Sequence, residues 1–195
     1  MSDLYNPEIF PTRKFGPIIT YMRLIFLILF IPFVSHAQLS KRDSLWLPFQ
    51  PLIGTWTGTG EGVDGNGMYE RTYQFVLNKK YIEVRNRTVY PMTKEKPKGY
   101  VHEDVGYISY DKMRKTFVFR QFHGEGFVNQ YILDSLSADK KTLVFISEAI
   151  ENIPTGWRAR ETYTVSNNTL TEVFNLAEPN KSFELYTKAQ LTRKE

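Results

Sequence analysis

Short stretches in which apolar and polar residues alternate follow one another from residue 53 to the C-terminus. They are rich in Tyr, Phe, Val, Ile and Thr, which favour the pleated, half-buried surface of a β-strand. Turn signals such as Asp-Gly-Asn-Gly and Asn-Asn separate them at intervals of about 8–12 residues, as in all-β domains. The pattern predicts ten strands, at 54–61, 69–77, 81–90, 101–110, 116–122, 127–134, 142–150, 157–165, 169–176 and 183–191.

The connections between these strands are short, and no long helices alternate with them, which excludes parallel α/β folds. The one helical signal lies at 45–52, where Ser44 can cap a helix that Pro48 and Pro51 limit to a turn or two. A twisted sheet of ten strands closes into a barrel or splits into a sandwich. We expect an all-β fold, an antiparallel up-and-down β-barrel of about ten strands, with an interior too wide for side chains alone to fill.

The N-terminal part of the chain carries a different signal. Arg23 precedes an apolar run at 24–34, and Ser-His-Ala then offers small residues before Gln38, which is the pattern of a secretory signal peptide. The run is shorter than the roughly 20 apolar residues of a membrane-spanning helix, although an uncleaved anchor is the alternative. We expect a leader and signal peptide at 1–37 with the true start at Met22. A linker with a short helical turn at 38–52 and a barrel at 53–193 follow.

This signal predicts a secreted or periplasmic protein with no stable membrane span after cleavage. The remaining chain of roughly 160 residues has the size of one domain, and it can bury a core without disulfides. The absence of cysteine excludes thiol nucleophiles and cysteine metal sites. Charge is nearly balanced, with 25 Lys and Arg against 21 Asp and Glu, and the basic residues gather in turns at 94–98 and 111–115. A nucleic-acid partner is therefore not expected.

One glycine-rich segment begins at Pro51 and reads P-L-I-G-T-W-T-G-T-G-E-G. Gly54 lets the chain bend into the first strand, and we expect Trp56 to close one end of the barrel. Gly58 and Gly60 lie on one face of the strand. A glycine face permits strong coiling at a barrel corner or the close approach of a flat ligand. Both interpretations stay open, and the second makes these glycines and the tryptophan ligand-binding candidates.

This segment resembles the G-x-W-x-G-x-G signature of the nitrobindin-type heme-binding β-barrels, and more broadly the G-x-W strand of lipocalins and fatty-acid-binding proteins. The segments 99–111 and 117–122 resemble uncharacterised bacterial lipocalin-like barrels, and Tyr107 in the first of them is a further binding candidate. The resemblance extends over roughly 49–193. It implies a ten-stranded barrel that holds heme b in a wide cleft and acts on reactive nitrogen species through that heme.

The family's iron ligand is a histidine on the closing strands near the C-terminus, but residues 182–191 read S-F-E-L-Y-T-K-A-Q-L. After the predicted signal peptide only His102 and His123 remain. His102-Glu103 starts like the zinc motif H-E-x-x-H, but Gly106 replaces its second histidine and the segment is a predicted strand. His123 is the candidate metal ligand if heme binds, with Tyr186 as the alternative; a simple turn position is the other interpretation of His123.

Two charges lie among apolar neighbours on their strand faces. Val118 and Phe122 flank Arg120, and Leu170 and Phe174 flank Glu172. Because a buried charge needs a partner, either residue is a candidate for an inward charge that fixes the polar end of a ligand. Most of the charged strand positions, a group that includes residue 161, are expected to face solvent.

Three functions remain open at this point. The first is the binding of a small apolar or amphipathic molecule such as a lipid, pigment or tetrapyrrole, and the second is a nitrobindin-like heme protein. The third is a scaffold whose barrel is filled by its own side chains. No nucleophile–base order, phosphate loop or paired-carboxylate spacing stands out, so we expect a binding protein more than an enzyme. A cavity of a few hundred Å³ favours binding, and a solid core favours the scaffold. Five aromatic positions either line or fill the lumen: Phe75, Phe117, Phe119, Tyr131 and Phe145.

Overall fold

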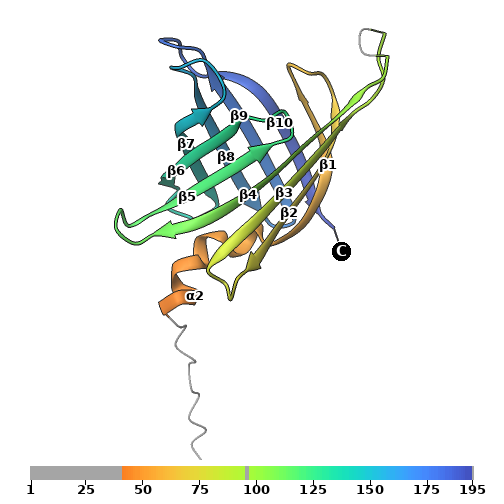
Figure 1. Ribbon diagram of the computed structural model, residues 1–195. Helices are drawn as coiled ribbons and strands as arrows, with labels where there is room; N and C mark the ends of the chain where they lie inside the picture. Colours follow the sequence, from red (N-terminus) through yellow and green to blue (C-terminus); the bar gives the residue numbers. More distant parts are fainter. Residues whose placement is uncertain (1–40, 95–96, 195) are drawn as a thin grey trace, which may run out of the picture. The chain divides into compact units, whose positions relative to one another are not determined.

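The computed structural model describes residues 41–94 and 97–194 (Figure 1). The predicted signal peptide and most of the predicted linker lie outside these residues. Among the helices that are described, none has the length and apolar character needed to cross a membrane.

Ten antiparallel strands form the fold, as predicted, and their ends lie within two residues of the predicted ones. They are β1 (Gly54–Gly62), β2 (Gly67–Val76), β3 (Tyr81–Tyr90), β4 (Tyr100–Asp111), β5 (Thr116–His123), β6 (Val128–Leu136), β7 (Thr142–Glu151), β8 (Arg158–Ser166), β9 (Thr169–Ala177) and β10 (Glu184–Arg193). Each strand pairs with its neighbours in sequence, and β1 also pairs with β10. The sheet is therefore a closed up-and-down barrel, which leaves no strand edge exposed.

Two short helices close one end of the barrel, where a helical turn was expected: α2 (Lys41–Trp46) and the 3₁₀ helix η1 (Leu47–Leu52) (Figure 1). Phe49 is fully buried, and its ring centroid lies 4.5 Å from that of Phe117 and 6.3 Å from that of Phe145. Trp46 is also buried and contacts Phe117 at 5.1 Å. The segment before the first strand is thus part of the core.

Strand β1 shows why its glycines are needed. A Cβ atom on Gly58 would clash with the backbone carbonyl of Gln190, and one on Gly60 would lie 2.8 Å from the carbonyl oxygen of Lys188. Both obstacles belong to β10, so these glycines let the first and last strands approach closely where the barrel closes. Trp56, two residues before Gly58, is fully buried, and its Nε1 donates a hydrogen bond to the carbonyl of Leu52 at 2.7 Å.

The interior has two different halves along the barrel axis. In the half next to α2, which we call the filled half, aromatic side chains pack against one another: Phe117, Phe119, Tyr131, Phe145 and Tyr163 are all buried. The ring of Phe119, for example, stacks on that of Tyr131 at 5.6 Å. These side chains fill the lumen and form the floor of the other half, which is hollow.

Candidate functional site

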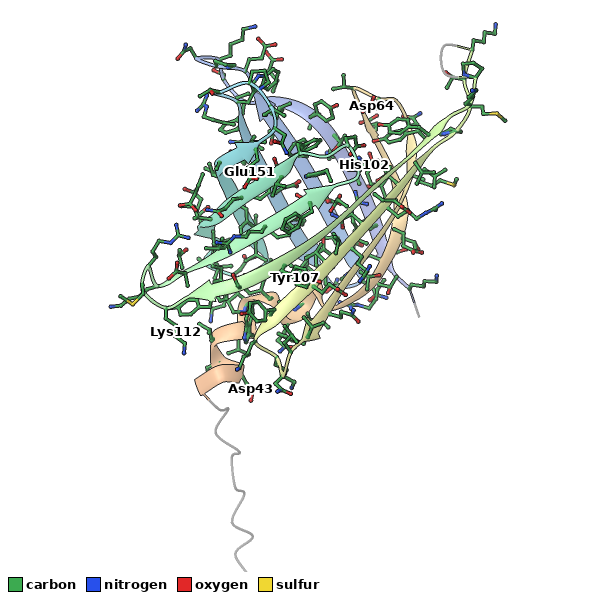
Figure 2. The ribbon with its side chains drawn as sticks, in the orientation of Figure 1. Asp43, Asp64, His102, Tyr107, Lys112 and Glu151 are labelled. Atoms are coloured by element: carbon green, nitrogen blue, oxygen red, sulfur yellow. The ribbon has the colours of Figure 1, made fainter. Side chains whose placement is uncertain are left out.

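The hollow half contains a cavity of about 540 Å³. Its lining reaches the turns at the end of the barrel away from α2, where Asp64 and His102 lie, whereas Asp43 of α2 lies at the opposite end (Figure 2). A ten-stranded barrel with one filled half therefore retains room for a ligand in the other.

The cavity has two walls of different chemistry. The apolar wall comes from β7, β9 and the turn between β7 and β8, and consists of Ile150, Ile153, Pro154, Trp157, Phe174 and Leu176. The polar wall comes from β2 to β6 and consists of Arg71, Asn86, His102, Asp104, Gln121, His123 and Asn129. An occupant with one apolar and one polar side would match this division.

A buried ion pair crosses the base of the cavity. Arg71 on β2 donates from Nε to Glu172 Oε2 on β9 at 2.9 Å, with the two side chains 7% and 9% exposed. The guanidinium also donates to the carbonyl of Arg87 and the hydroxyl of Thr88. Burial opposes the charge of Arg71, but the carboxylates of Glu172 and Asp104 raise its pKa above the ordinary value. Arg71 is therefore charged and is held by hydrogen bonds from its Nε and Nη1.

Glu161 on β8 lies close to this pair and is also buried. Burial, together with the negative charge of Glu172, raises the pKa of Glu161 well above its ordinary value. Its Oε2 has no hydrogen-bond partner among the described residues. Burial therefore favours the protonated, neutral form of Glu161, and the expectation that charged strand positions mostly face solvent does not hold for this residue.

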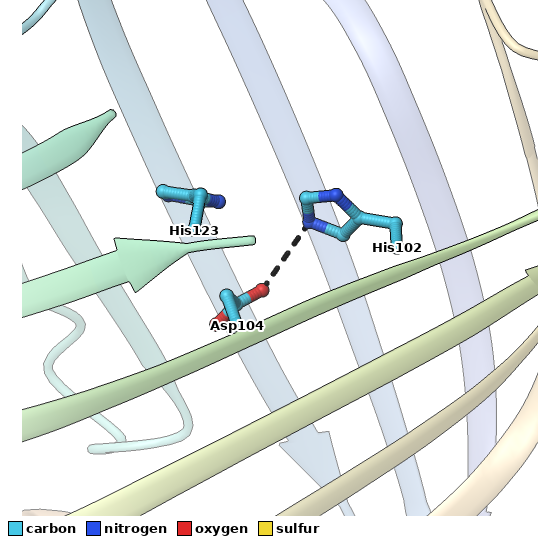
Figure 3. A group of neighbouring side chains, drawn as sticks. All are labelled: His102, Asp104 and His123. Carbon is cyan, nitrogen blue, oxygen red and sulfur yellow. Dashed lines mark ion pairs between the residues drawn. The ribbon is translucent and has the colours of Figure 1, made fainter. Parts of the chain in front are cut away.

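Two histidines and an aspartate meet on the polar wall (Figure 3). His102 and Asp104 are two residues apart on β4 and face inward together, and Asp104 is paired in register with His123 on β5. His102 Nε2 lies 3.4 Å from Asp104 Oδ2, and His102 Nδ1 lies 2.7 Å from Glu125 Oε1. The hydrogen bonds to Asp104 and Glu125 raise the pKa of His102, whereas burial lowers the pKa of His123 to about 4. His123 is therefore a neutral imidazole at physiological pH.

Several buried polar atoms of the cavity wall have no hydrogen-bond partner among the described residues. They are Asn86 Oδ1, Gln121 Oε1, His123 Nδ1, Asn129 Oδ1 and Glu161 Oε2. Such atoms are few in native proteins, because each one buried without a partner costs roughly 1–3 kcal/mol. Four of them are amide or carboxyl oxygens, so the wall has hydrogen-bond acceptor capacity that the described residues do not use.

The binding candidates from the sequence are only partly brought together. His123 and Glu172 line the cavity, and Glu172 faces inward as expected. Arg120 is exposed and donates to Gln130, because inward positions on β5 alternate and place Gln121 inside. The apolar neighbours that suggested an inward Arg120 share its outer face.

The remaining candidates lie elsewhere. Tyr107 is 38% exposed on the outer surface and donates a hydrogen bond to Glu83. Gly54, Trp56, Gly58 and Gly60 are not part of the cavity lining, and the glycines serve the β1–β10 closure. Tyr186, the alternative metal ligand, does line the cavity.

Sequence reasoning considered His102 only as the start of a zinc motif and missed it as a cavity residue. In the structure His102 lies within β4 and lines the cavity. The period-two spacing of His102 and Asp104 is the signal that could have found them, once the β4–β5 register set Asp104 opposite His123.

Comparison with known proteins agrees with this architecture. Among solved structures, that of Rv2717c from M. tuberculosis is similar, with a TM-score of 0.59 and 16% sequence identity over 81% of this chain and 100% of that chain. At this identity the similarity shows the fold alone. No curated protein matches the chain. Residues 46–193 match the model of the family described as the THAP4-like, heme-binding beta-barrel domain. The chain therefore belongs to this family of nitrobindin-type, ligand-binding β-barrels.

Proposed function

We propose that this protein binds a small amphipathic molecule in the hollow half of its barrel. The observation that carries the proposal is a cavity of about 540 Å³ with an apolar wall on one side and unpaired hydrogen-bond acceptors on the other. This volume lies within the range of about 300–1,000 Å³ that is usual for small-molecule sites. The filled half supplies a rigid floor, so binding needs no collapse of the barrel.

The apolar wall provides the affinity. A ligand that buries about 200 Å² of apolar surface against Trp157, Phe174 and Leu176 gains roughly 5 kcal/mol from the hydrophobic effect. An aliphatic chain or a small ring system suits such a wall, since contact with it needs no directional bonds.

The polar wall selects the head group. Five carboxyl groups line the cavity, at Asp64, Asp104, Glu125, Glu161 and Glu172. Among the described lining residues, Arg71 is the one Arg or Lys side chain, and Glu172 already neutralises it. Glu161 is held toward its neutral form, but the other four carboxyl groups outnumber Arg71, so a carboxylate head group is repelled. A hydroxyl or an ammonium group instead donates to the acceptors that are unpaired among the described residues. We infer that the ligand is a neutral or cationic amphiphile.

Membership in the family makes heme b a possible cofactor, but the residues of this cavity do not fit it well. On β10, where the family's histidine is expected, Tyr186 and Thr187 reach the cavity instead. His123 Nδ1 is an imidazole nitrogen without a partner in the part of the chain that the structure describes, but acidic side chains share the cavity lining with it. The two heme propionates would find no free cationic side chain among the described lining residues. Heme is therefore not the occupant we propose.

Binding is tested by calorimetric titration of the purified protein, in EDTA, with dodecylamine, dodecanol, dodecanoate and hemin. We expect dodecylamine and dodecanol to bind, and dodecanoate to bind at least about tenfold more weakly. In the absorption spectrum, hemin should give no sharp Soret band. Leu176→Trp fills the cavity and should abolish binding, while Val173→Trp, on the same strand but outside the cavity lining, should not. Equal affinity for amine and carboxylate, or binding unchanged in Leu176→Trp, would refute the proposal.

We also propose that the protein is exported, on the basis of the signal-peptide pattern at 22–37. N-terminal sequencing of the protein recovered from its native host tests this proposal. A mature N-terminus at Gln38 is the expected result, and an intact N-terminus would contradict it.

A further inference from the structure

The polar wall contains a group of metal-binding side chains that the proposed amphiphile does not require. One nitrogen each from His102 and His123 and one oxygen from Asp104 all lie within 4.8 Å of one another (Figure 3). We propose that these three residues bind one divalent transition-metal ion inside the barrel. Two imidazoles and a carboxylate are a ligand set that Zn²⁺ and Fe²⁺ use in sites that keep an open coordination position.

The groups behind two of the proposed ligands hold them in place. His102 Nδ1 is 2.7 Å from the Glu125 carboxylate, which leaves His102 Nε2 for a metal. Asp104 Oδ1 accepts hydrogen bonds from Asn86 Nδ2 at 2.9 Å and Gln121 Nε2 at 2.8 Å, which leaves Asp104 Oδ2 for a metal. Metal-binding histidines and carboxylates in proteins are oriented in the same way by outer hydrogen bonds.

The third proposed ligand, His123, is also held in place by neighbouring side chains. His123 Nε2 is 3.1 Å from the Asn129 amide, and its ring stacks on Phe127 with centroids 4.0 Å apart. His123 Nδ1 is buried and has no partner among the described residues. A metal at Nδ1 requires a proton on Nε2, and a turn of the Asn129 amide lets its unpaired Oδ1 accept that proton. Tyr131, now 2.7 Å from Asn129 Nδ2, can then donate its hydroxyl proton to the same oxygen.

The distances are compatible with one shared ion. Two ligand atoms at about 2.1 Å from a tetrahedral ion are roughly 3.4 Å apart. His102 Nε2 and Asp104 Oδ2 are 3.4 Å apart without any further movement. Because one ligand atom from each of the three residues lies within 4.8 Å of the others, a shift of the His123 ring by about 1.5 Å brings its nitrogen to the same separation from both partners. The remaining coordination position then faces the cavity, where water or a donor atom of a ligand can occupy it.

Calorimetric titration of the untagged, EDTA-treated protein with Zn²⁺, and visible absorption with Co²⁺, test the site. We expect one ion per chain. His102→Ala and His123→Ala should each weaken binding by at least about 100-fold, and Glu125→Gln by about 10–100-fold through loss of the outer hydrogen bond. Glu103→Gln is the matched control: Glu103 is exposed on the outer face of the same strand, so affinity should not change.

A second measurement does not depend on the stability of the variants. In NMR spectra of the wild-type protein, Zn²⁺ should shift the ring signals of His102 and His123. If the protein sample still contains residues 1–37, the ring signal of His36 should not shift. Absence of Zn²⁺ binding to the wild type overturns the proposal and leaves His102 as a residue that bridges the carboxyl groups of Asp104 and Glu125. Binding that the His102 and His123 variants do not weaken also overturns it. EDTA removes metal ions from the amphiphile titrations, so their result does not depend on the proposed metal site. Failure of either proposal is therefore distinguishable from failure of the other.

Discussion

Replacement of Glu172 by Leu is the perturbation for which the structure predicts the largest loss of stability on the cavity wall. It leaves the charged Arg71 in the interior without its carboxylate, although both side chains are less than 10% exposed. Removal of one partner from such a pair costs about 3–5 kcal/mol, because the remaining charge keeps its desolvation cost and loses its attraction. Since domains of this kind unfold with about 5–15 kcal/mol, Glu172→Leu should lose a large part of the total stability.

The double variant Arg71→Met/Glu172→Leu distinguishes this explanation from a simple packing defect. It removes both charges and fills the space with apolar atoms, which in other buried pairs is neutral or stabilising. We therefore expect the double variant to be more stable than Glu172→Leu by about 3 kcal/mol or more. Equilibrium unfolding in urea at pH 7, followed by circular dichroism, measures the free energies for the complete mutant cycle.

The matched control is Glu103→Leu. Glu103 pairs with Arg87 at 3.2 Å, but the two side chains are 64% and 51% exposed. An exposed pair of this kind contributes about 0–1 kcal/mol, so its loss should be small. If Glu172→Leu costs no more than Glu103→Leu, or if the double variant is as unstable as Glu172→Leu, the buried charge pair does not have the role assigned to it.

Three further predictions concern stability. The pKa of Glu161 is higher in the folded state than in the unfolded state, so above about pH 4.5 the folded protein binds more protons than the unfolded chain. The free energy of unfolding therefore falls by up to about 1.4 kcal/mol per pH unit until the pH reaches the folded pKa. Glu161→Gln should remove this slope in urea titrations between pH 5 and 8, and an unchanged slope would assign it to other groups. Phe49→Ala should cost about 3–5 kcal/mol in the same assay, against less than about 1 kcal/mol for Phe122→Ala, which is 46% exposed. Gly58→Ala should lower the melting temperature clearly because its methyl group clashes with β10; a neutral Gly58→Ala would show that the closure adapts.

The strands and their closure could be predicted from the sequence because both depend on local signals. Alternation with period two marks each strand, and glycine or asparagine marks each turn, as Gly65 and Asn167 do with positive φ values of 97° and 53°. Short connections then leave few topologies besides an up-and-down barrel. The glycine–tryptophan segment also identified the family, although its glycines serve strand closure.

The inward charges could not be predicted in the same way. Alternation tells which residues of a strand share a face, but not which face is inside when both faces carry apolar residues. For this reason Arg120 was a candidate for an inward charge, although Gln121 occupies the inward position, and Glu161 belonged to a group of charges of which most were expected outside. The His102–Asp104–His123 group depends on the β4–β5 register as well, which a single strand does not reveal.

The three tryptophans provide the most direct test of the central claim, that a ligand occupies the hollow half of the barrel. Trp157 lines the cavity, whereas Trp46 and Trp56 are buried in the filled half and its closure. In NMR spectra recorded in EDTA, addition of dodecylamine should shift the indole N–H signal of Trp157 and leave those of Trp46 and Trp56 in place. A Trp157 signal that does not move, or a shift confined to Trp46 and Trp56, would contradict the account.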